Sequence, residues 1–422
     1  MRIALLSDHE STGGAAIAAS RLAAGLIDAG HEVVRLVNSP DGRRHEWTVR
    51  KLTVGAQRSL PQRLLGRLMT TALRQVMSQR EMIAGLDSML QELQPDIINV
   101  HNIHGIDQPL GLVDTCCKHT NVVWTLHDMW SFTGRCAYAY DCRRFVGGCN
   151  AACPSPKEYP ALEPSRIEQA WKRRESLFAE RAEMVAITPS RWLRQEALNG
   201  LWKGHRVEHI ANGLPLGTYR LEDRAFARKA LDLPESSAPV LMVAAQDLSD
   251  RRKGGAQLWQ ALRQVSRRPL TVLTLGDGSL PEPIEGVDVR PLGYVDHERT
   301  KVLAYNAADA FVHPAPVDNL PNVVVEAIAC GTPVIAFPTG GLPELVQPGQ
   351  TGWLASDNTA AALAASIDEA VVDLSSGADL RAICRAAAEN HYSIERQARQ
   401  YLALFSSLLG AVSAVTSLTE IV

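Results

Sequence analysis

The sequence lacks the features that would place the chain across a membrane or on nucleic acid. No apolar run approaches the ~20 residues needed to span a bilayer. The formal net charge of the 422 residues is only −3 at pH 7, so we expect no nucleic-acid partner. The first ten residues turn acidic at Asp8 and Glu10 before the core of a signal peptide could form. We therefore expect a cytoplasmic location.

Cysteine is also scarce, and no short-period repeat is present. Eight cysteines in a chain of this length do not make a disulfide scaffold, so reduced thiols or a metal site are expected instead. The chain is too long for one ordinary core. Its length predicts two domains of about 200 residues each.

Short apolar runs alternate with helical patterns along the whole chain. Residues 2–7 predict a buried strand, which is followed by a turn at Gly13 and Gly14 and a small-residue helix over 15–29. Further strands are predicted at residues 31–37, 96–100, 122–126, 183–188, 207–210, 240–245, 270–275, 288–290, 310–312 and 333–337. This alternation predicts an α/β fold with doubly wound parallel sheets. A turn at 212–215 marks the expected domain boundary.

Two acidic residues, Asp318 and Glu326, stand eight positions apart. Asp318 lies in a loop before a predicted helix, and Glu326 lies about two turns into that helix. A loop that runs into a helix N-terminus suits an anion such as a phosphate. Since carboxylates repel phosphate, we expect both to face sugar and ribose hydroxyls. The spacing therefore predicts a pocket for a nucleotide sugar.

The residues around this pair resemble a known family signature. The stretch from Asp318 to Glu326, with the glycine-containing segments at 331–333, 340–346 and 349–352, resembles the donor site of retaining glycosyltransferase family 4 (group 1), as in bacterial exopolysaccharide and colanic-acid type transferases. The resemblance implies the GT-B fold, with two Rossmann-like domains facing across a cleft. Residues 1–212 would bind the acceptor and 213–391 the nucleotide sugar, and a helix in 392–422 would cross back to the first domain.

The same resemblance implies the reaction and the roles of the site residues. A sugar would pass from a UDP- or GDP-sugar to a saccharide or lipid-linked saccharide, and no cofactor is required for catalysis. Glu326 would hold the ribose, and Asp318, where the family has the longer Glu, would hold the donor sugar. Further donor contacts are expected from Asn319, Leu320, Pro321 and Asn322, with Tyr294 and Val295 near the base. A sugar-nucleotide epimerase, a pseudo-glycosyltransferase and a non-catalytic nucleotide-sugar-binding protein are the alternatives.

Basic residues follow a strand of the second domain, where cations can neutralise a departing diphosphate. A solvated basic turn is the other interpretation of this run. The family has Arg and Lys separated by four residues, but Leu248 stands at the arginine position relative to Lys253. We therefore expect Lys253 to act, with Arg252 or Arg251 in place of the missing arginine.

Two further candidates lie in the first domain. Gly13 and Gly14 let the backbone approach a phosphate, although a plain tight turn explains them as well; the resemblance implies contact with the donor diphosphate. His127 stands at the carboxyl end of a predicted strand, where open α/β sheets place ligands, and the resemblance puts it near the donor. His101 and His104, after the preceding strand, either line the acceptor cleft or lie in a surface loop, and we favour the surface loop.

Four cysteines fall within 18 residues, with gaps of five, six and three residues between them. Four thiolates would bind a structural zinc ion and leave no position open for catalysis. Two disulfides or four free thiols bracing a loop are the alternative. The cysteines are Cys136, Cys142, Cys149 and Cys153.

The stretch 43–80 interleaves arginines with leucines and other apolar residues. A basic amphipathic pattern of this kind is typical of helices on a membrane surface, which would give peripheral contact at the inner face of the membrane. A surface helix packed on the first domain is the favoured alternative. The sequence does not predict the oligomeric state.

Overall fold

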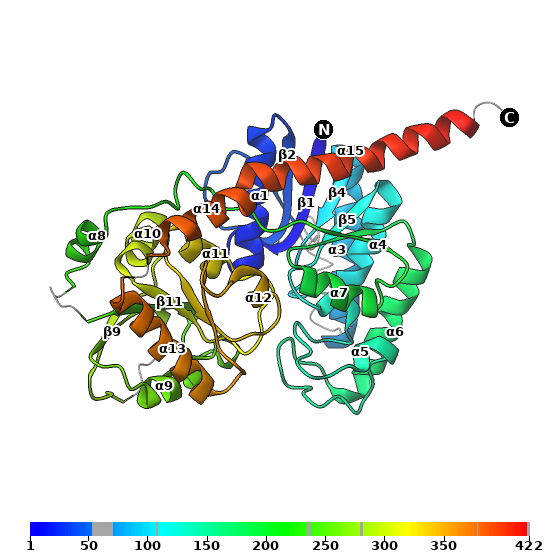
Figure 1. The fold of residues 1–422 in the computed structure, drawn as a ribbon. Coiled ribbons are helices and arrows are strands. Elements are labelled where there is room, and N and C mark those ends of the chain that lie inside the picture. Colours follow the sequence, from blue (N-terminus) through cyan, green and yellow to red (C-terminus); the bar gives the residue numbers. More distant parts are fainter. Residues whose placement is uncertain (53–70, 107–108, 234–237, 279–281, 378, 420–422) are drawn as a thin grey trace. The chain divides into compact units, whose positions relative to one another are not determined.

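The computed structural model describes residues 1–52, 71–106, 109–233, 238–278, 282–377 and 379–419, with only the backbone path given for 71–79 and 411–419. The chain forms two compact units (Figure 1). Unit 1 comprises Met1–Pro189, Leu193–Ile210 and Gln397–Val422, and unit 2 comprises Ser190–Trp192 and Ala211–Arg396. Each unit is built on its own parallel sheet.

The sheet of unit 1 has seven parallel strands in the order β3-β2-β1-β4-β5-β6-β7. The direction of winding reverses between β1 and β4, so the carboxyl ends of these two strands form a topological switch point, where open α/β sheets bind ligands. The strands are β1 Arg2–His9, β2 Glu32–Ser39, β3 Thr48–Lys51, β4 Ile97–Val100, β5 Val122–Thr125, β6 Val185–Thr188 and β7 Arg206–His209.

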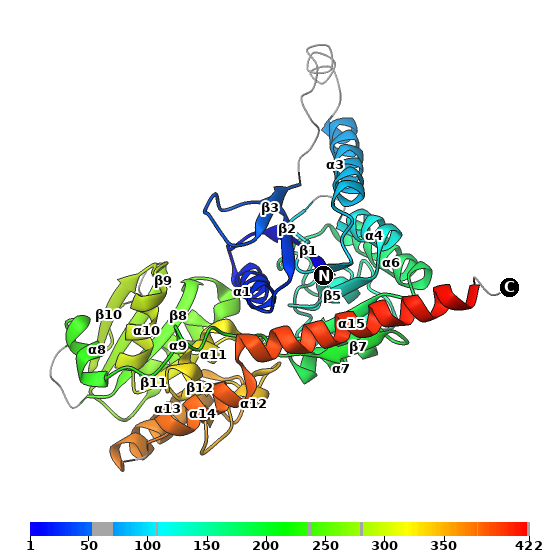
Figure 2. The same cartoon turned by 90° about the horizontal axis from the view of Figure 1, so that it is seen from above.

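Helices cover both faces of this sheet, as Figure 2 shows. On one face, Leu22 of α1 and Tyr401 of α15 pack in one buried cluster with Ile3 and Leu5 of β1. Helices α3, α4 and α6 lie on the other face (Figure 2). The helices in this half are α1 Gly14–Asp28, α3 Thr71–Leu93, α4 Pro109–His119, η1 Trp130–Phe132, α5 Arg144–Gly147, α6 Pro164–Glu180, α7 Arg191–Asn199 and the C-terminal α15 Ile394–Thr419.

The C-terminal helix α15 belongs to the core of unit 1. From Gln397 onwards it clusters with this unit, and the Tyr401 hydroxyl lies 3.0 Å from Oγ1 of Thr125. Nδ2 of Asn99 donates to the same Oγ1 at 2.9 Å. A buried polar network therefore fixes the helix against β4 and β5, because buried polar groups are costly unless they are hydrogen-bonded.

The sheet of unit 2 has six parallel strands in the order β10-β9-β8-β11-β12-β13. Its switch point lies between β8 and β11. The strands are β8 Val240–Asp247, β9 Leu270–Asp277, β10 Val287–Gly293, β11 Ala310–His313, β12 Val334–Ala336 and β13 Gly352–Leu354.

Alternate residues of these strands face two separate apolar clusters. Leu241 and Val243 of β8 pack with α9 and α13, whereas Val240 and Met242 pack with α10, α11 and α14. The helices are α8 Arg224–Ala230, η2 Arg251–Lys253, α9 Gly255–Gln264, α10 Glu298–Ala307, α11 Asn322–Ala329, α12 Leu342–Leu345, α13 Ala360–Ser375 and α14 Arg381–His391.

The predicted α/β class with doubly wound parallel sheets is confirmed. The sequence patterns did not predict β3 or β13, which are edge strands of four and three residues. Much of the basic stretch 43–80 lies outside the described residues, so its two interpretations stay predictions. None of the helices within the described ranges is both long and apolar enough to cross a membrane.

Candidate functional site

A lysine and two other ionisable groups meet at the switch point of unit 2. Nζ of Lys253 lies 3.1 Å from Oδ2 of Asp318, and Nε2 of His313 lies 3.5 Å from the same oxygen. Lys253 ends η2 after β8, His313 ends β11, and Asp318 lies in the loop that follows β11. Strands adjacent in the sheet thus bring together residues that are 65 positions apart in the sequence.

The position of Lys253 depends on a tight turn that the sequence encodes. The side chain of Asp250 accepts a hydrogen bond from the backbone N–H of Arg252 at 2.9 Å, which starts η2. Gly254 then takes φ +74°, and a Cβ there would lie 1.7 Å from the carbonyl oxygen of Pro314. Only glycine allows this approach, so the turn is held directly against the end of β11.

The loop that carries Asp318 is fixed from two sides. The backbone N–H of Asn319 donates to Oδ1 of Asp318 at 2.9 Å, and Oγ of Ser190 donates to the Asn319 side-chain oxygen. Gly341 donates its N–H to the Asp318 carbonyl, and a Cβ on Gly341 would lie 1.9 Å from the Asn319 carbonyl oxygen. Asp318 is therefore held in place before any ligand arrives.

The charges at this site stabilise an ionised carboxylate. Burial alone would raise the pKa of Asp318, but the Lys253 ammonium and the nearby His313 imidazole hold that pKa well below its usual value. Burial lowers the pKa of His313, and Asp318 offsets only part of this effect. At neutral pH the site therefore offers a carboxylate acceptor beside an ammonium donor.

Glu326 lies on α11, which starts at Asn322 with Pro321 as its N-cap residue. The prediction that Glu326 lies two turns into the helix is wrong, because it lies just over one turn from the start. Its side chain is buried, and Oε2 accepts a hydrogen bond from the Tyr305 hydroxyl at 3.1 Å. Burial and the nearby Glu326 carboxylate raise the pKa of Tyr305, so Tyr305 remains a hydrogen-bond donor. The contact between Tyr305 and Glu326 was not predicted from the sequence.

The remaining predicted donor residues differ in exposure. Arg251 is exposed, whereas the guanidinium of Arg252 is paired with Asp250 at 2.7 Å. Tyr294 is 57% exposed after β10, and Val295 packs against the core of unit 2. Leu320, like Asn319, is buried in the loop before α11. Lys253 thus contacts the Asp318 carboxylate directly.

In unit 1, Gly13 and Gly14 stand at the N-terminus of α1. Gly13 takes φ +88° as the N-cap residue, and a Cβ there would meet nothing within 4 Å. The need for glycine at this position comes from its backbone angle and not from close packing. Space beside Gly13 is consistent with a ligand or with an open turn, and both interpretations stay open.

His127 follows β5 and is paired with another histidine. Nδ1 of His101, after β4, lies 2.9 Å from Nε2 of His127, and the rings stack with their centres 5.2 Å apart. Burial lowers the pKa of His127 to about 4 and also lowers that of His101. Both rings are therefore neutral at pH 7 and share one proton in this hydrogen bond.

The interpretation of His101 and His104 as surface-loop residues is wrong, because both side chains are buried. Nε2 of His104 lies 3.1 Å from Oδ2 of Asp128, and its Nδ1 lies 3.1 Å from the Tyr159 hydroxyl. Burial alone would lower the pKa of His104, but the Asp128 carboxylate raises it. His101 and His104 follow the carboxyl end of β4, where open α/β sheets place ligand-binding side chains, and that strand end was predicted from the sequence.

A pocket of about 550 Å³ opens beside His104 within unit 1. It lies between α4 and α6, and apolar side chains such as Ile106 and Leu177 alternate with cations around it. Polar and aromatic residues that line it include His104, Trp130, Arg135, Arg166, Arg173 and Arg174. Arg166 and Arg173 are exposed. This mixed lining suits a polar or anionic ligand with an apolar face.

Three ionisable residues of unit 1 form a group that could hold a cation. Ligand atoms of Glu10, Asp41 and His45 all lie within 4.8 Å of one another. However, these atoms already bond to fixed protein groups: Nε1 of Trp47 donates to Glu10 at 3.0 Å, and Oγ of Ser11 donates to Asp41 at 2.6 Å. An imidazole–carboxylate network accounts for this cluster without an ion.

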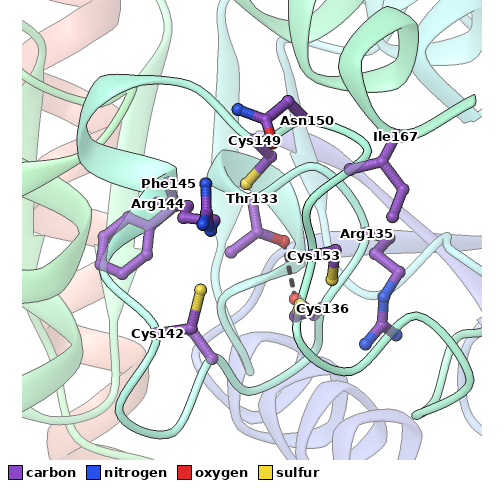
Figure 3. A pocket seen from close by; sticks show the side chains of 11 residues that line it. Thr133, Arg135, Cys136, Cys142, Arg144, Phe145, Cys149, Asn150, Cys153 and Ile167 are labelled. Atoms are coloured by element: carbon purple, nitrogen blue, oxygen red, sulfur yellow. Dashed lines mark hydrogen bonds between the residues drawn. The ribbon is translucent and has the colours of Figure 1, made fainter. Parts of the chain in front are cut away.

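The four clustered cysteines line one small pocket in unit 1 (Figure 3). All four are free thiols, and so are the other four cysteines of the chain. Among the described residues, the sulfurs do not form a group of three within 4.8 Å of one another. The structure thus brings the predicted ligands to one place but leaves them further apart than ligands around a bound zinc ion.

Two family models match the chain and together cover most of it. The model described as Glycosyltransferase Family 4 matches residues 12–217, and the model described as Glycosyl transferases group 1 matches residues 238–373. The chain belongs to glycosyltransferase family 4. The match to the second model includes Lys253, Asp318 and Glu326, so this family assignment extends over the residues gathered at the switch point of unit 2.

Curated relatives of this family 4 chain are similar over part of their length. A protein of Escherichia coli (strain K12) named as a colanic acid biosynthesis glycosyl transferase, WcaC, is 29% identical over 60% of this chain and 62% of its own length. A D-inositol 3-phosphate glycosyltransferase of Mycobacterium leprae (strain Br4923) is 34% identical over 43% of this chain and 44% of its own. The matched segments thus span less than two thirds of these relatives.

Solved structures match nearly the whole family 4 chain. Sucrose-phosphate synthase from Thermosynechococcus elongatus gives a TM-score of 0.73 at 22% identity, covering 97% of this chain and 100% of that one. HepE of Anabaena, in complex with UDP, gives 0.68 at 20% identity, covering 97% and 100%. At such identities the likeness shows the fold alone, and the chain has the GT-B fold of two Rossmann-like domains.

Proposed function

We propose that this family 4 chain is a retaining glycosyltransferase that moves a sugar from a nucleoside-diphosphate sugar to a saccharide or lipid-linked saccharide acceptor in polysaccharide synthesis. Unit 2 binds the donor, and unit 1 binds the acceptor. The single observation that carries the proposal is the Lys253–Asp318 pair at the switch point of unit 2. Such a pair matches a ligand that has anionic phosphates beside neutral hydroxyls.

In the proposed donor complex, Lys253 exchanges its Asp318 contact for the β-phosphate. The side chain of Lys253 is 36% exposed, whereas that of Asp318 is 12% exposed, so the lysine is the more accessible of the two. As the glycosidic bond breaks, negative charge grows on the leaving diphosphate, and a nearby ammonium stabilises it. Asp318 then accepts hydrogen bonds from hydroxyls of the donor sugar.

Glu326 is the proposed ribose ligand. Its carboxylate is held by Tyr305, so it is oriented before the nucleotide binds. The N-terminus of α11, one turn away, has the positive end of its dipole near the phosphates. UDP is the first nucleotide to test, since HepE of Anabaena is similar in fold and was solved with UDP and with UDP-glucose.

The pocket of unit 1 is the proposed acceptor site. Its exposed arginines, Arg166 and Arg173, suit an anionic group on the acceptor. The acceptor hydroxyl loses its proton to the departing phosphate, which needs no further base. Retention proceeds by front-face departure and attack, or by double displacement.

The test is nucleoside diphosphate release from a panel of UDP-, GDP- and ADP-sugars, with and without lipid-linked and free saccharide acceptors. Lys253→Ala should lower kcat/KM by about 10²- to 10³-fold, as the loss of one charge-stabilising donor does. Lys229→Ala is the matched control, because Lys229 is an exposed lysine on α8 in the same unit.

Other outcomes separate the alternatives. An epimerase would change the sugar of the donor without an acceptor, and a binding protein would bind the nucleotide without turnover. The proposal fails if no donor gives release and if Lys253→Ala and Glu326→Ala bind UDP, GDP and ADP as the unmodified chain does.

A further inference from the structure

Two buried arginines near the four-cysteine pocket form no ion pair with a carboxylate of the described residues. Arg135 and Arg174 are 2% and 3% exposed. Arg135 donates to the carbonyl oxygens of Ser155, Glu158 and Pro160. Arg174 donates to the carbonyls of Trp130 and Ala170, and its guanidinium lies 4.1 Å from the centre of the Trp130 ring.

Within the part of the chain that the structure describes, neither guanidinium forms an ion pair with a carboxylate. Burying a charge without a counter-charge is expensive. Arg135 lines the same small pocket as the four cysteines, so a negatively charged group in that pocket would lie beside its guanidinium.

The thiols do not supply that charge by themselves. A cysteine thiol has an ordinary pKa of about 8.5, so free thiols are mostly protonated and uncharged at neutral pH. A divalent metal ion changes this balance, because thiols lose their protons when they bind one.

We propose that Cys136, Cys142, Cys149 and Cys153 bind a zinc ion, whose thiolate complex is the counter-charge for Arg135 and Arg174. Four thiolates and one Zn²⁺ carry a net charge of −2, which the two guanidinium groups neutralise. Binding converts four thiols and Zn²⁺ into one complex and releases four protons to solvent. No electron is transferred, and no oxidant is needed.

The backbone around the cysteines fits this role. All four cysteines line a single pocket (Figure 3). A Cβ on Gly134 would lie 2.6 Å from Cβ of Cys149 and 3.3 Å from its sulfur. Glycine at position 134 therefore lets the backbone approach this cysteine closely. Metal binding would draw the sulfurs together from their present separations.

The proposed site has a structural consequence for unit 1. Arg135 lines both the cysteine pocket and the 550 Å³ pocket, and it holds the loop at Ser155, Glu158 and Pro160. The zinc complex thus fixes the loop that forms one wall of the larger pocket. This inference does not depend on the proposed transfer reaction.

The test begins with metal analysis of the intact chain, purified under reducing conditions without chelator. About one zinc per chain is expected, as for a four-thiolate site. Cys142→Ser and Cys149→Ser should lose the metal, whereas Cys117→Ser should keep it. Cys117 is the matched control, because it is a partly buried free cysteine of unit 1 outside the pocket.

A second measurement remains decisive if the serine variants do not fold. Removal of zinc from the unmodified chain and addition of Co²⁺ should give the thiolate-to-cobalt charge-transfer bands of a tetrahedral thiolate site. Less than about half an equivalent of zinc without these bands would overturn the proposal. The proposal would also be overturned if Cys142→Ser contained as much zinc as the unmodified chain, or if the four thiols were found to be paired in two disulfides.

Discussion

At the residue scale, the chemistry of both units depends on ionisable side chains at the ends of adjacent parallel strands. Lys253, Asp318 and His313 meet in unit 2, and His101 and His127 meet in unit 1. Each group contains a buried histidine, whose pKa burial lowers. A neutral imidazole can accept or donate a hydrogen bond without adding charge to the site.

The buried histidine pair predicts a loss of stability in acid. The folded pKa of His127 is about 4, against about 6.5 in an unfolded chain. The unfolded chain therefore binds the proton first, so stability is complete above pH 6.5 and falls as the pH drops towards 4. For one such group the total effect is about 3 kcal/mol. Urea unfolding of unit 1 between pH 8 and pH 4.5 measures it.

The variant that checks this assignment is His127→Gln, which should unfold with a shallower dependence on pH over that window. His9→Gln is the control, because the His9 side chain is exposed in the same unit. If the midpoint of urea unfolding changed with pH equally in the unmodified chain and in His127→Gln, a group other than His127 would be responsible.

Some candidate site residues were predicted from the sequence, but the contacts between them were not, because these contacts depend on the order of strands in the sheet. Lys253 and Asp318 were predicted from their chemical roles near a strand end. Their mutual contact was not predicted, because it depends on β8 and β11 being neighbours in the sheet. The same limit hid the pairing of His101 with His127, since a single sequence shows strand ends but not strand order.

At the element scale, short elements and helix starts were the least predictable. The edge strands β3 and β13 have four and three residues, which is too short for a period of two to stand out. The start of α11 was misjudged because Pro321 acts as its N-cap residue, and proline fixes the chain just before or at a helix start. Long buried strands such as β1 were predicted correctly.

We predict that position 254, in the turn after η2, requires glycine because any Cβ there would clash with the neighbouring backbone. Gly254 and Gly349 both have φ +74°, but a Cβ at 254 would lie 1.7 Å from Pro314 O, whereas at 349 it would meet nothing within 4 Å. Gly349→Ala should therefore cost only the backbone strain, about 1–2 kcal/mol. Gly254→Ala should cost more, and it should also weaken nucleotide binding because Lys253 moves.

Thermal unfolding and nucleotide titration of the two alanine variants measure both effects. Because Gly254 and Gly349 have the same φ angle, the two alanine variants differ only in whether the added Cβ meets a neighbouring atom. Equal losses of stability in the two variants, with nucleotide affinity unchanged in Gly254→Ala, would contradict the close approach of this turn to the end of β11.

At the scale of the whole molecule, the two units divide the proposed reaction. Each has its own parallel sheet and its own apolar clusters, and the last helix returns from unit 2 to the core of unit 1. A domain built this way can bind its ligand through its own switch point. The division predicts that the donor nucleotide and the cysteine site affect different segments of the chain.

Hydrogen–deuterium exchange measures this division directly. A saturating concentration of UDP, or of whichever nucleoside diphosphate raises the melting temperature, should slow exchange in residues 248–254 and 313–326 of unit 2. Protection should also appear at residues 11–16 if Gly13 and Gly14 contact the diphosphate.

Zinc removal should instead speed exchange in residues 133–160 of unit 1, where Arg135 holds the loop. Lys253→Ala should abolish the nucleotide effect at 248–254 but leave the zinc effect intact, because ligand binding protects the segments that it contacts. Nucleotide protection centred on residues 133–160, with none at 313–326, would reverse the assignment of donor and acceptor to the two units.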